Sequence, residues 1–333
     1  MRQHVLAGAI FALASGCSPE NSVDRNAHTD TFLQEPVADV DILWVIDNSV
    51  SMASEQQLVA DGFASFISTI EDTNINFQIG VVTTDMDAGN PDAGVLLGEP
   101  AYLTSDDDYI TLFQERIQVG TEGSDHEKGL AAALEALTEP KASGVNDGFL
   151  RPDAVLSIIF VSDEDDCSDD NALDGQDGSA CYQSEQLLVP VKDYIDDFRD
   201  LKAGTNGRVI ASGILGPDAS AGCDETWPGH RYEAVAQGLG GIVGSICDAN
   251  YSEIMDQMGL AVSGVLSVFQ LEFVPVVESL EVAVDDELIG EDPVNGWTYD
   301  EEYYTIRFDG DYVPPRGTSV SITYEVAGSI PSK

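Results

Sequence analysis

The stretch Asp41–Met52, DILWVIDNSVSM, carries the strongest signal of fold class in this chain. Residues 42–46 are all apolar, so they lack the alternation of apolar and polar side chains that is typical of a half-exposed antiparallel strand. An unbroken apolar run is typical of a central strand in a parallel sheet that helices cover on both faces. Asp47, Ser49 and Ser51 follow the carboxyl end of this strand, where open α/β sheets place their ligand sites.

Segments with helical and with strand patterns alternate downstream of this strand. Apolar residues recur at helical spacing in 54–73, 110–119, 125–137, 184–203 and 252–270. Short, mostly apolar runs predict strands at 76–84, 154–162, 208–216 and 242–247. Strands separated by helical lengths indicate βαβ units. We therefore predict a doubly wound α/β domain over residues 39–271, with a mostly parallel sheet flanked by helices.

The pattern changes after residue 271. Residues 272–330 contain short alternating segments, among them SLEVAV and SVSITYEV, with Pro, Gly and Asp between them. Alternation of this kind is typical of strands that are buried on one face only. The sequence therefore predicts a small C-terminal antiparallel β module.

The first 17 residues, MRQHVLAGAIFALASGC, are typical of an export signal. Arg2 is followed by an apolar segment, Val5–Ala14, that is too short to span a bilayer permanently. Cys17 comes directly after small residues and resembles the cysteine of a bacterial lipobox, although Ala14 stands where Leu is usual. We predict a lipoprotein signal over 1–17 with lipidation at Cys17. An ordinary signal peptide cut nearby is the alternative.

Residues 18–38 are polar and contain two prolines, which predicts a flexible tether between the anchor and the domain. Ser18, rather than Asp, follows Cys17, so the common inner-membrane retention signal is missing. We therefore expect an outer-membrane lipoprotein of a bacterial envelope, which contacts the membrane through the lipid on Cys17.

The composition limits the classes of partner. The chain has 333 residues, of which 43% are hydrophobic, so it can bury a sizeable core. Sixty acidic residues against fourteen basic ones give a net charge of -46, which excludes nucleic acid as a partner. Most of the carboxylates are expected to form a solvated surface.

Cysteine usage is consistent with export. Five cysteines are present, and removing Cys17 as a lipid anchor leaves Cys167, Cys181, Cys223 and Cys247. Four cysteines allow three pairings, of which we favour the local one, 167 with 181 and 223 with 247, because it closes the shortest loops. A zinc site is disfavoured because no two cysteines have CxxC spacing.

Oxygen-bearing side chains recur at three predicted loops on one edge of the sheet. Asp47, Ser49 and Ser51 follow the first strand, Asp163 follows another apolar strand directly, and Ser124 precedes a predicted helix. Hard cations such as Mg²⁺ take oxygen ligands of these kinds. The competing interpretation is local: Ser51 would only cap a helix, and Ser124 would form an S-x-x-E capping box with Glu127.

The run DILWVIDNSVSM resembles the opening strand of a von Willebrand factor type A domain, and DNSVS matches the D-x-S-x-S metal motif of that family. The resemblance covers residues 39–271 and implies a doubly wound sheet with a metal-ion-dependent adhesion site at its top. It assigns Asp47, Ser49 and Ser51 to the first metal loop.

The same resemblance assigns two further loops. Ser124 stands where the family usually has Thr, with Thr121 as the alternative ligand, and Asp163 matches the aspartate of the third loop, although Glu164 replaces the usual Gly after it. The family leaves one coordination position open for a carboxylate of a partner protein. The resemblance therefore implies Mg²⁺, with Mn²⁺ or Ca²⁺ as alternatives, and a protein partner with an exposed Asp or Glu.

A second cation hypothesis concerns the acidic loop Asp163–Cys181, DEDDCSDDNALDGQDGSAC. Besides Asp163, its aspartates are Asp165, Asp166, Asp169, Asp170, Asp174 and Asp177. Their number would suit Ca²⁺, but their spacing does not match the EF-hand pattern. A solvated acidic loop is the favoured interpretation.

The sequence thus predicts a membrane-anchored, metal-dependent protein-binding module. A structural envelope lipoprotein, in which the metal only stabilises the fold, is the alternative, and a metal-assisted hydrolase is a third and weaker one. We expect no enzymatic activity, because the chain contains no G-x-x-x-x-G-K-[ST] loop, no G-x-S-x-G elbow and no H-E-x-x-H pair.

Overall fold

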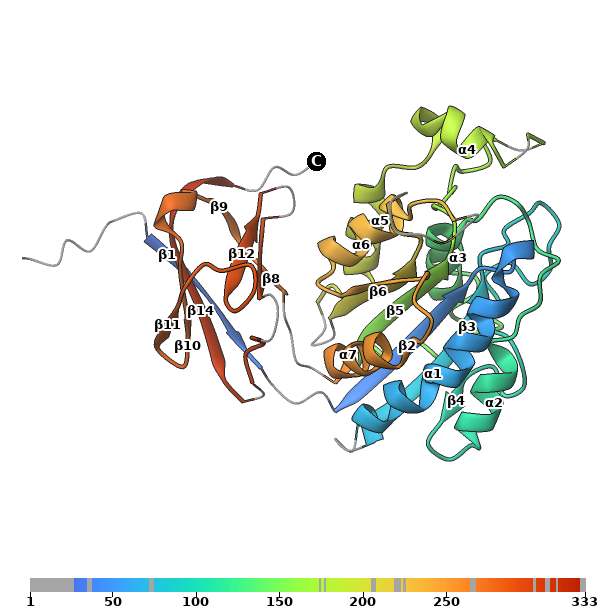
Figure 1. The fold of residues 1–333 in the computed structure, drawn as a ribbon, viewed down its shortest axis with the longest axis horizontal. Coiled ribbons are helices and arrows are strands. Elements are labelled where there is room, and N and C mark those ends of the chain that lie inside the picture. Colours follow the sequence, from blue (N-terminus) through green and yellow to red (C-terminus); the bar gives the residue numbers. More distant parts are fainter. Residues whose placement is uncertain are drawn as a thin grey trace, which may run out of the picture.

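The computed structural model describes residues 27–34, 38–71, 75–173, 175–176, 178–204, 208–218, 223, 226–263, 268–301, 304–308, 312–315 and 317–329. It contains an α/β domain and an antiparallel β module, which lie side by side in Figure 1.

A mixed, mainly parallel sheet forms the centre of the α/β domain. Its strand order is β4-β3-β2-β5-β6-β7. The strands are β2 (Asp39–Ile46), β3 (Asn76–Thr83), β4 (Leu103–Thr104), β5 (Val155–Ser162), β6 (Val209–Leu215) and β7 (Val243–Ser245). All neighbours pair in parallel except β3 and β4, which are antiparallel. The prediction of a mostly parallel sheet is confirmed, with β2 at its centre.

Helices cover both faces of this sheet (Figure 1). They are α1 (Ala53–Glu71), α2 (Tyr109–Arg116), α3 (Gly129–Leu137), α5 (Val191–Asp200), α6 (His230–Gly238) and α7 (Ser252–Val262). Trp44 packs with Phe63 of α1 on one face, whereas Leu43 and Val45 pack with Leu130 of α3 on the other. Because successive β2 side chains enter two different cores, the run 42–46 is apolar without alternation.

The β module is antiparallel, as predicted. One sheet has the order β1-β14-β10-β11 with β9 also paired to β14, and the other has the order β12-β13-β8. The strands are β1 (Ala27–Leu33), β8 (Val268–Gln270), β9 (Phe273–Pro275), β10 (Glu281–Val284), β11 (Glu287–Ile289), β12 (Trp297–Asp300), β13 (Thr305–Phe308) and β14 (Ser319–Ser329). Phe269, Trp297, Ile306 and Tyr324 lie in its core.

The predicted tether over 18–38 is wrong for residues 27–33, which form β1. This strand pairs with β14 along its whole length, and in Figure 1 it lies, in blue, among the red strands of the module. Only Asp30 of β1 is buried, so the strand carries almost no apolar signal. Residues 18–26, like the predicted signal over 1–17 and Cys17, lie outside the described residues.

The predicted boundary at 271/272 and the predicted helix over 252–270 are also wrong in part. Helix α7 ends at Val262, and Val268–Gln270 is β8, which pairs with β13. The C-terminal part of the β module, which follows the α/β domain, therefore begins by residue 268. The apolar residues of β8 extend the helical spacing of α7 by coincidence, so the sequence pattern did not separate the two elements.

One other predicted helix needs correction, and one helix was missed. The helix predicted over 184–203 is shorter, because Pro190 stands at the N-cap of α5. The residues before it form α4 (Ala180–Gln183) and a 3-10 turn, Glu185–Leu187. Helix α6 was not predicted at all.

Candidate metal centre

The loop after β2 brings three of the predicted ligands together. Asp47 is fully buried (0% exposed); its Oδ1 accepts a hydrogen bond from the Ser49 amide at 2.7 Å, and its Oδ2 accepts one from Ser162 Oγ at 2.7 Å. The Oγ atoms of Ser49 and Ser51 are 3.2 Å apart. Ser49 occupies the N-cap of the following 3-10 turn, Val50–Met52, yet makes no side-chain capping bond. The loop therefore gathers a carboxylate and two hydroxyls.

The end of β5 adds two more carboxyl groups. Asp163 is only 4% exposed, and its Oδ1 is buried with no hydrogen-bond partner among the described residues. Burial raises the pKa of Asp163 to about 7, with a further contribution from the charge of Asp47, while a hydrogen bond from Ser51 opposes the shift. Burial and the charges of Asp47 and Asp163 likewise raise the pKa of Glu164 to about 7. Because β2 and β5 are parallel neighbours, their carboxyl ends meet here.

Glu127 is a member of this cluster that the sequence reasoning missed. Its side chain is 1% exposed, its Oε2 accepts a hydrogen bond from Thr84 Oγ1, and its Oε1 has no partner within the described chain. Burial, followed by the charge of Asp47, raises the pKa of Glu127 well above its usual value. Burial also raises the pKa of Asp47. The interaction between the two carboxyl groups raises the pKa of Glu127 further and opposes the rise at Asp47, so Glu127 is the member of the pair that holds a proton more readily.

The predicted capping box of Ser124 and Glu127 is wrong. Helix α3 begins at Gly129, and Glu127 points to Thr84 rather than to a helix end. Ser124 Oγ instead accepts a hydrogen bond from the His126 amide at 3.1 Å and donates to Asp87 Oδ1 at 2.8 Å.

The second predicted loop nevertheless lies against the first. The amide of Gly123 donates to the backbone carbonyl of Asn48 at 2.9 Å, and a Cβ at Gly123 would come within 2.3 Å of the Asn48 side chain. Ser124 is thus adjacent to the loop of Asp47, but its hydroxyl is engaged by Asp87. Thr121, the alternative ligand, is half-buried.

These groups suit a hard cation. The charge of Asp47 raises the pKa values of Glu127, Asp163 and Glu164, so these carboxyl groups lie around Asp47. Buried carboxylates of this kind need either protons or a positive ion. Two buried carboxylate oxygens, on Glu127 and Asp163, have no partner among the described residues, and the predicted ligand atoms are carboxylate and hydroxyl oxygens, which Mg²⁺ prefers.

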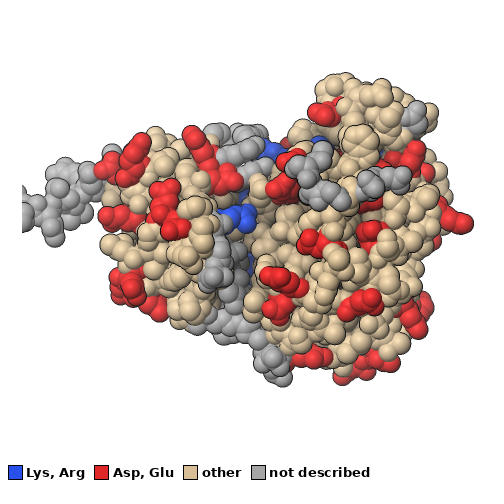
Figure 2. All heavy atoms as spheres, viewed as in Figure 1, with Lys and Arg blue, Asp and Glu red and all other residues tan. Residues whose placement is uncertain are grey.

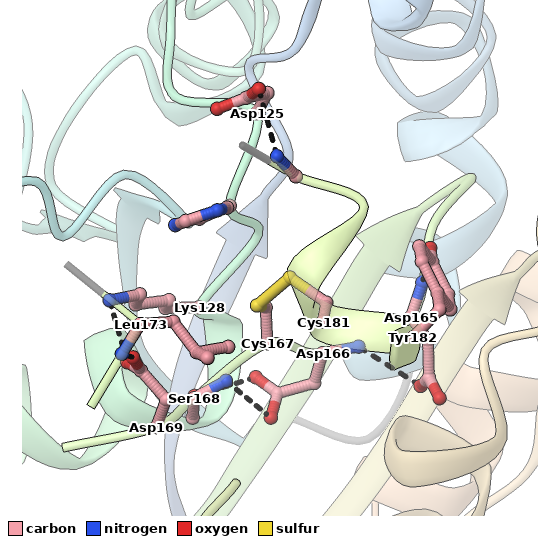
Figure 3. The surroundings of a disulfide bond; sticks show 12 residues. Asp125, Lys128, Asp165, Asp166, Cys167, Ser168, Asp169, Leu173, Cys181 and Tyr182 are labelled. Carbon is pink, nitrogen blue, oxygen red and sulfur yellow. Dashed lines mark hydrogen bonds and ion pairs between the residues drawn. A yellow bond between two sulfur atoms is a disulfide. The ribbon is translucent and has the colours of Figure 1, made fainter. Parts of the chain in front are cut away.

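The acidic loop after Asp163 is held by internal contacts rather than arranged around a cation (Figure 3). Asp166 accepts hydrogen bonds from the Leu130 amide and Ser168 Oγ and is 3.1 Å from Arg231 Nε. Asp169 forms a buried ion pair with Lys128 at 2.7 Å. These contacts favour the interpretation without calcium, but the prediction of a solvated loop is wrong for Asp166 and Asp169, which are 1% and 2% exposed. Asp174 and Asp177 lie outside the described residues.

The local disulfide pairing is confirmed. Cys167 bonds to Cys181 and Cys223 bonds to Cys247, with Cα–Cα distances of 5.3 and 5.4 Å. The first disulfide closes the acidic loop, and the Cys167 amide donates to the Glu127 carbonyl at 2.6 Å (Figure 3). This backbone hydrogen bond, beside the disulfide, therefore ties the loop to the segment that carries Glu127.

A separate group of titratable side chains lies in the β module. His28 Nε2 is 2.9 Å from Asp30 Oδ1 and 3.2 Å from Glu272 Oε2. One ligand atom from each of these three side chains lies within 4.8 Å of the other two, a spacing at which they could hold a metal ion. The same distances are those of an imidazolium between two carboxylates, and Asp30 also accepts a hydrogen bond from Tyr324 OH at 2.7 Å.

Comparisons with known proteins leave the family open. No protein-family model and no curated protein matches the chain. The pilus adhesin SpaC from Lactobacillus rhamnosus GG is 12% identical over 90% of this chain and 40% of its own, with a TM-score of 0.39. Proximal thread matrix protein 1 from the mussel byssus is 15% identical over 72% of this chain and 51% of its own, with a TM-score of 0.38.

The chain spans about half the length of these solved structures, or less. Similarities this weak assign neither a family nor a function to it. The resemblance to von Willebrand factor type A domains therefore stays an expectation that rests on the residues of this chain.

Proposed function

We propose that the α/β domain is a divalent-cation-dependent protein-binding module of the adhesion type. Asp47, Ser49, Ser51 and Asp163 would hold the cation, and Ser124 would join them once its hydroxyl leaves Asp87. Mg²⁺ is the preferred ion, with Mn²⁺ or Ca²⁺ as alternatives. The observation that carries the proposal is the buried Asp163 Oδ1, which has no hydrogen-bond partner among the described residues and lies at the sheet edge where the Asp47 loop ends.

The donor set suggests how such a module would bind. A bound cation would supply an electrophilic point for an outside carboxylate. Ser49 and Ser51 contribute neutral hydroxyls, so among the proposed ligands only the carboxylates of Asp47 and Asp163 offset the positive charge. Ser162 holds the Asp47 carboxylate in place through its 2.7 Å hydrogen bond. The proposed partner is a protein with an exposed Asp or Glu, and no nucleic acid.

The net charge of -46 affects the encounter with such a partner. Repulsion between two acidic surfaces is screened beyond roughly 8 Å at physiological salt. Recognition therefore depends on the short-range contact at the cation and should be faster at higher ionic strength.

The proposed location is the outer membrane of a bacterial envelope, with Cys17 as the lipidated anchor. The export-like residues 1–17 and the two disulfides support this location. None of the helices in the described ranges is both long and apolar enough to cross a membrane. Since β1 begins only ten residues after Cys17, the β module would lie closer to the membrane than the α/β domain.

The alternative is a structural lipoprotein in which the cation only stabilises the fold. The buried carboxyl cluster favours this possibility too, because any cation would offset its mutual repulsion. Only the protein-binding function requires a coordination position of the cation that is open to outside ligands. The absence of catalytic activity stays a prediction from the sequence.

The open position can be tested with Mn²⁺ as a paramagnetic probe. We expect water proton relaxation by the Mn²⁺-loaded chain, residues 18–333, to fall when acetate is added, because acetate displaces a metal-bound water. An Asp47→Asn variant should lose this response, and Asp61→Asn, an exposed change of the same charge on α1, should keep it. A Mn²⁺ site that depends on Asp47 but ignores acetate would favour the structural function instead.

A further inference from the structure

Positive charge is rare in this protein, and three of its basic residues line a single cavity. The chain has only 14 Lys and Arg residues against 60 acidic ones. Figure 2 shows that most of the blue surface visible in this view lies along the junction between the two parts, whereas red surface is spread over both. Arg199, Lys202 and Arg208 all line one cavity of about 330 Å³ at this junction.

The rest of the cavity lining is mostly apolar, apart from Gln270 and Thr305, and both parts of the chain build it. Phe32 of β1 and Phe269 of β8 come from the β module, and Ile210 of β6 and Leu239 after α6 come from the α/β domain. Its volume is at the lower end of the range for small-molecule sites. A ligand here would have a small apolar body and would touch both parts.

Two of the three cations are already satisfied by the protein. Arg199 Nη2 donates to the Gly238 carbonyl and to Gln270 Oε1, each at 2.7 Å. Lys202 Nζ donates to the Arg151 carbonyl at 2.5 Å and lies 3.7 Å from Asp41 Oδ2. These contacts join the walls of the cavity. Among its three basic residues, Arg208 differs because two of its guanidinium nitrogens have no hydrogen-bond partner in the described residues.

Arg208 forms no ion pair with any residue that the structure describes. Its Nε and Nη2 are buried without a hydrogen-bond partner anywhere in the described chain. Burial lowers the pKa of Arg208, and no acidic group opposes the shift. By contrast, Arg151 pairs with both Asp39 and Asp41. A desolvated guanidinium with neither a hydrogen bond nor an anion is costly, although acidic residues are abundant elsewhere.

The two orphan nitrogens define the missing partner. Nε and Nη2 lie on one edge of the guanidinium, and this edge binds a carboxylate through two parallel hydrogen bonds. A single unpaired guanidinium balances a single negative charge. A phosphate would bring more charge and more acceptor oxygens than the apolar walls can satisfy.

We propose that this cavity binds an amphipathic monocarboxylate, with the carboxylate on Arg208 and the apolar body between Phe32 and Phe269. Arg208 turns its Nε–Nη2 edge into the cavity to receive the ligand. The ligand then bridges the β module and the α/β domain. This site is separate from the proposed metal centre, which lies at the opposite, carboxyl ends of the strands, whereas Arg208 immediately precedes the first residue of β6.

Hexanoate is a suitable probe, because it combines a carboxylate with a short apolar chain. We expect calorimetry on residues 18–333, with EDTA present, to detect one hexanoate site, and Arg208→Gln to weaken it at least tenfold. Hexanol, which lacks the charge, should bind at least tenfold more weakly than hexanoate. Unchanged binding in Arg208→Gln, or equal binding of hexanol, would overturn the proposal, as would inorganic phosphate binding as tightly as hexanoate.

Arg116→Gln is the matched control. Arg116 also has buried guanidinium nitrogens without a partner in the described residues, but it does not line this cavity. Its replacement should leave hexanoate affinity unchanged, and an equal loss in both variants would contradict the proposal.

A thermal measurement covers the case in which a variant folds poorly. Because the charge of Arg208 is uncompensated, Arg208→Gln should melt no lower than the wild type without ligand. Hexanoate should raise the Tm of the wild type by mass action, and hexanol should not. A Tm of the wild type that ignores hexanoate would refute the site.

Discussion

Ser162 is the residue whose contribution to the candidate metal centre is easiest to isolate. It is the last residue of β5, it is buried, and its hydroxyl donates to Asp47 Oδ2 at 2.7 Å. Its Oγ also accepts a hydrogen bond from the Glu164 amide at 3.1 Å and lies 3.0 Å from the Glu164 carbonyl oxygen. One side chain therefore orients a proposed ligand and the turn that carries Asp163.

Replacing Ser162 by Ala should weaken Mg²⁺ binding by about 10- to 100-fold, as is usual when a hydrogen-bond partner of a metal ligand is removed. Ser157→Ala is the control, because Ser157 is buried in the same strand and its hydroxyl has no partner among the described residues. Calorimetric titration of both variants with Mg²⁺ checks the prediction. Equal affinities in the two variants would show that Ser162 does not position a ligand.

Asp163 and Glu164 give the stability a defined pH dependence. Both have pKa values raised to about 7, so the folded chain binds more protons than the unfolded chain between about pH 4 and pH 7. Without divalent cations, their contribution to the free energy of unfolding should therefore fall as pH rises through this window. Saturating Mg²⁺ should remove the fall, because the cation replaces the protons.

Chemical denaturation between pH 5 and pH 8, in EDTA and in Mg²⁺, measures this effect. Asp163→Asn should reduce the pH slope in EDTA, which separates the site from the general acidity of the surface. A slope that is the same in the variant, or insensitive to Mg²⁺, would argue against a shared proton and cation site.

Strand β1 shows how an element can be structural while its sequence reads as a tether. Its single buried residue, Asp30, accepts hydrogen bonds through Oδ2 from Tyr324 OH at 2.7 Å and from the Glu272 amide at 3.0 Å. This carboxylate joins β1, β14 and the segment between β8 and β9.

We expect Asp30→Ala to lower the free energy of unfolding by about 1–3 kcal/mol, because it leaves buried donors unpaired. Thr29→Ala should cost much less, since the Thr29–Thr323 hydroxyl contact is exposed. Urea denaturation of the two variants compares them directly. If Asp30→Ala were no worse than Thr29→Ala, β1 would not be held as the hydrogen bonds indicate.

The sequence predicts an element well where burial leaves a periodic signal. Strand β2 faces two cores and reads as an unbroken apolar run, whereas β1 buries one aspartate and leaves no run to detect. Strand β8 was merged with α7 because three residues are too few to establish a new period. The boundaries that failed are those set by long-range pairing, as in β1 with β14.

The residues of the candidate site likewise fall into those that the sequence indicates and those that only the fold brings together. Asp47 and Asp163 could be found because each directly follows an apolar strand. Glu127 precedes a helix and sits three residues after Ser124, so the sequence suggested for it only the capping role of the competing interpretation. Its real neighbours, Thr84 and Asp47, are 43 and 80 positions away in the chain, and only the fold brings them together.

At the scale of the whole molecule, both ends of the described chain build the β module. The α/β domain is thus inserted between β1 and β8, and the two parts are joined through contacts such as Arg199 with Gln270. The charge of -46 acts across this arrangement, because carboxylates cover both parts (Figure 2).

Self-repulsion of this size should make the protein more stable at higher ionic strength. We expect the Tm in EDTA to rise as NaCl increases from about 0.01 M to about 0.15 M, because the screening length falls from about 30 Å to about 8 Å. Choline chloride should act like NaCl, since screening does not depend on the identity of the cation. A Tm that falls with salt would contradict the role given to net charge.

The most direct test of the metal centre is calorimetric titration of residues 18–333 with Mg²⁺ at moderate salt. Asp47→Asn and the exposed, charge-matched Asp61→Asn run beside the wild type, because an acidic surface collects divalent ions loosely. We predict one stoichiometric site in the wild type and in Asp61→Asn that is absent from Asp47→Asn. Identical isotherms for all three proteins would mean that the Asp47 loop binds no cation.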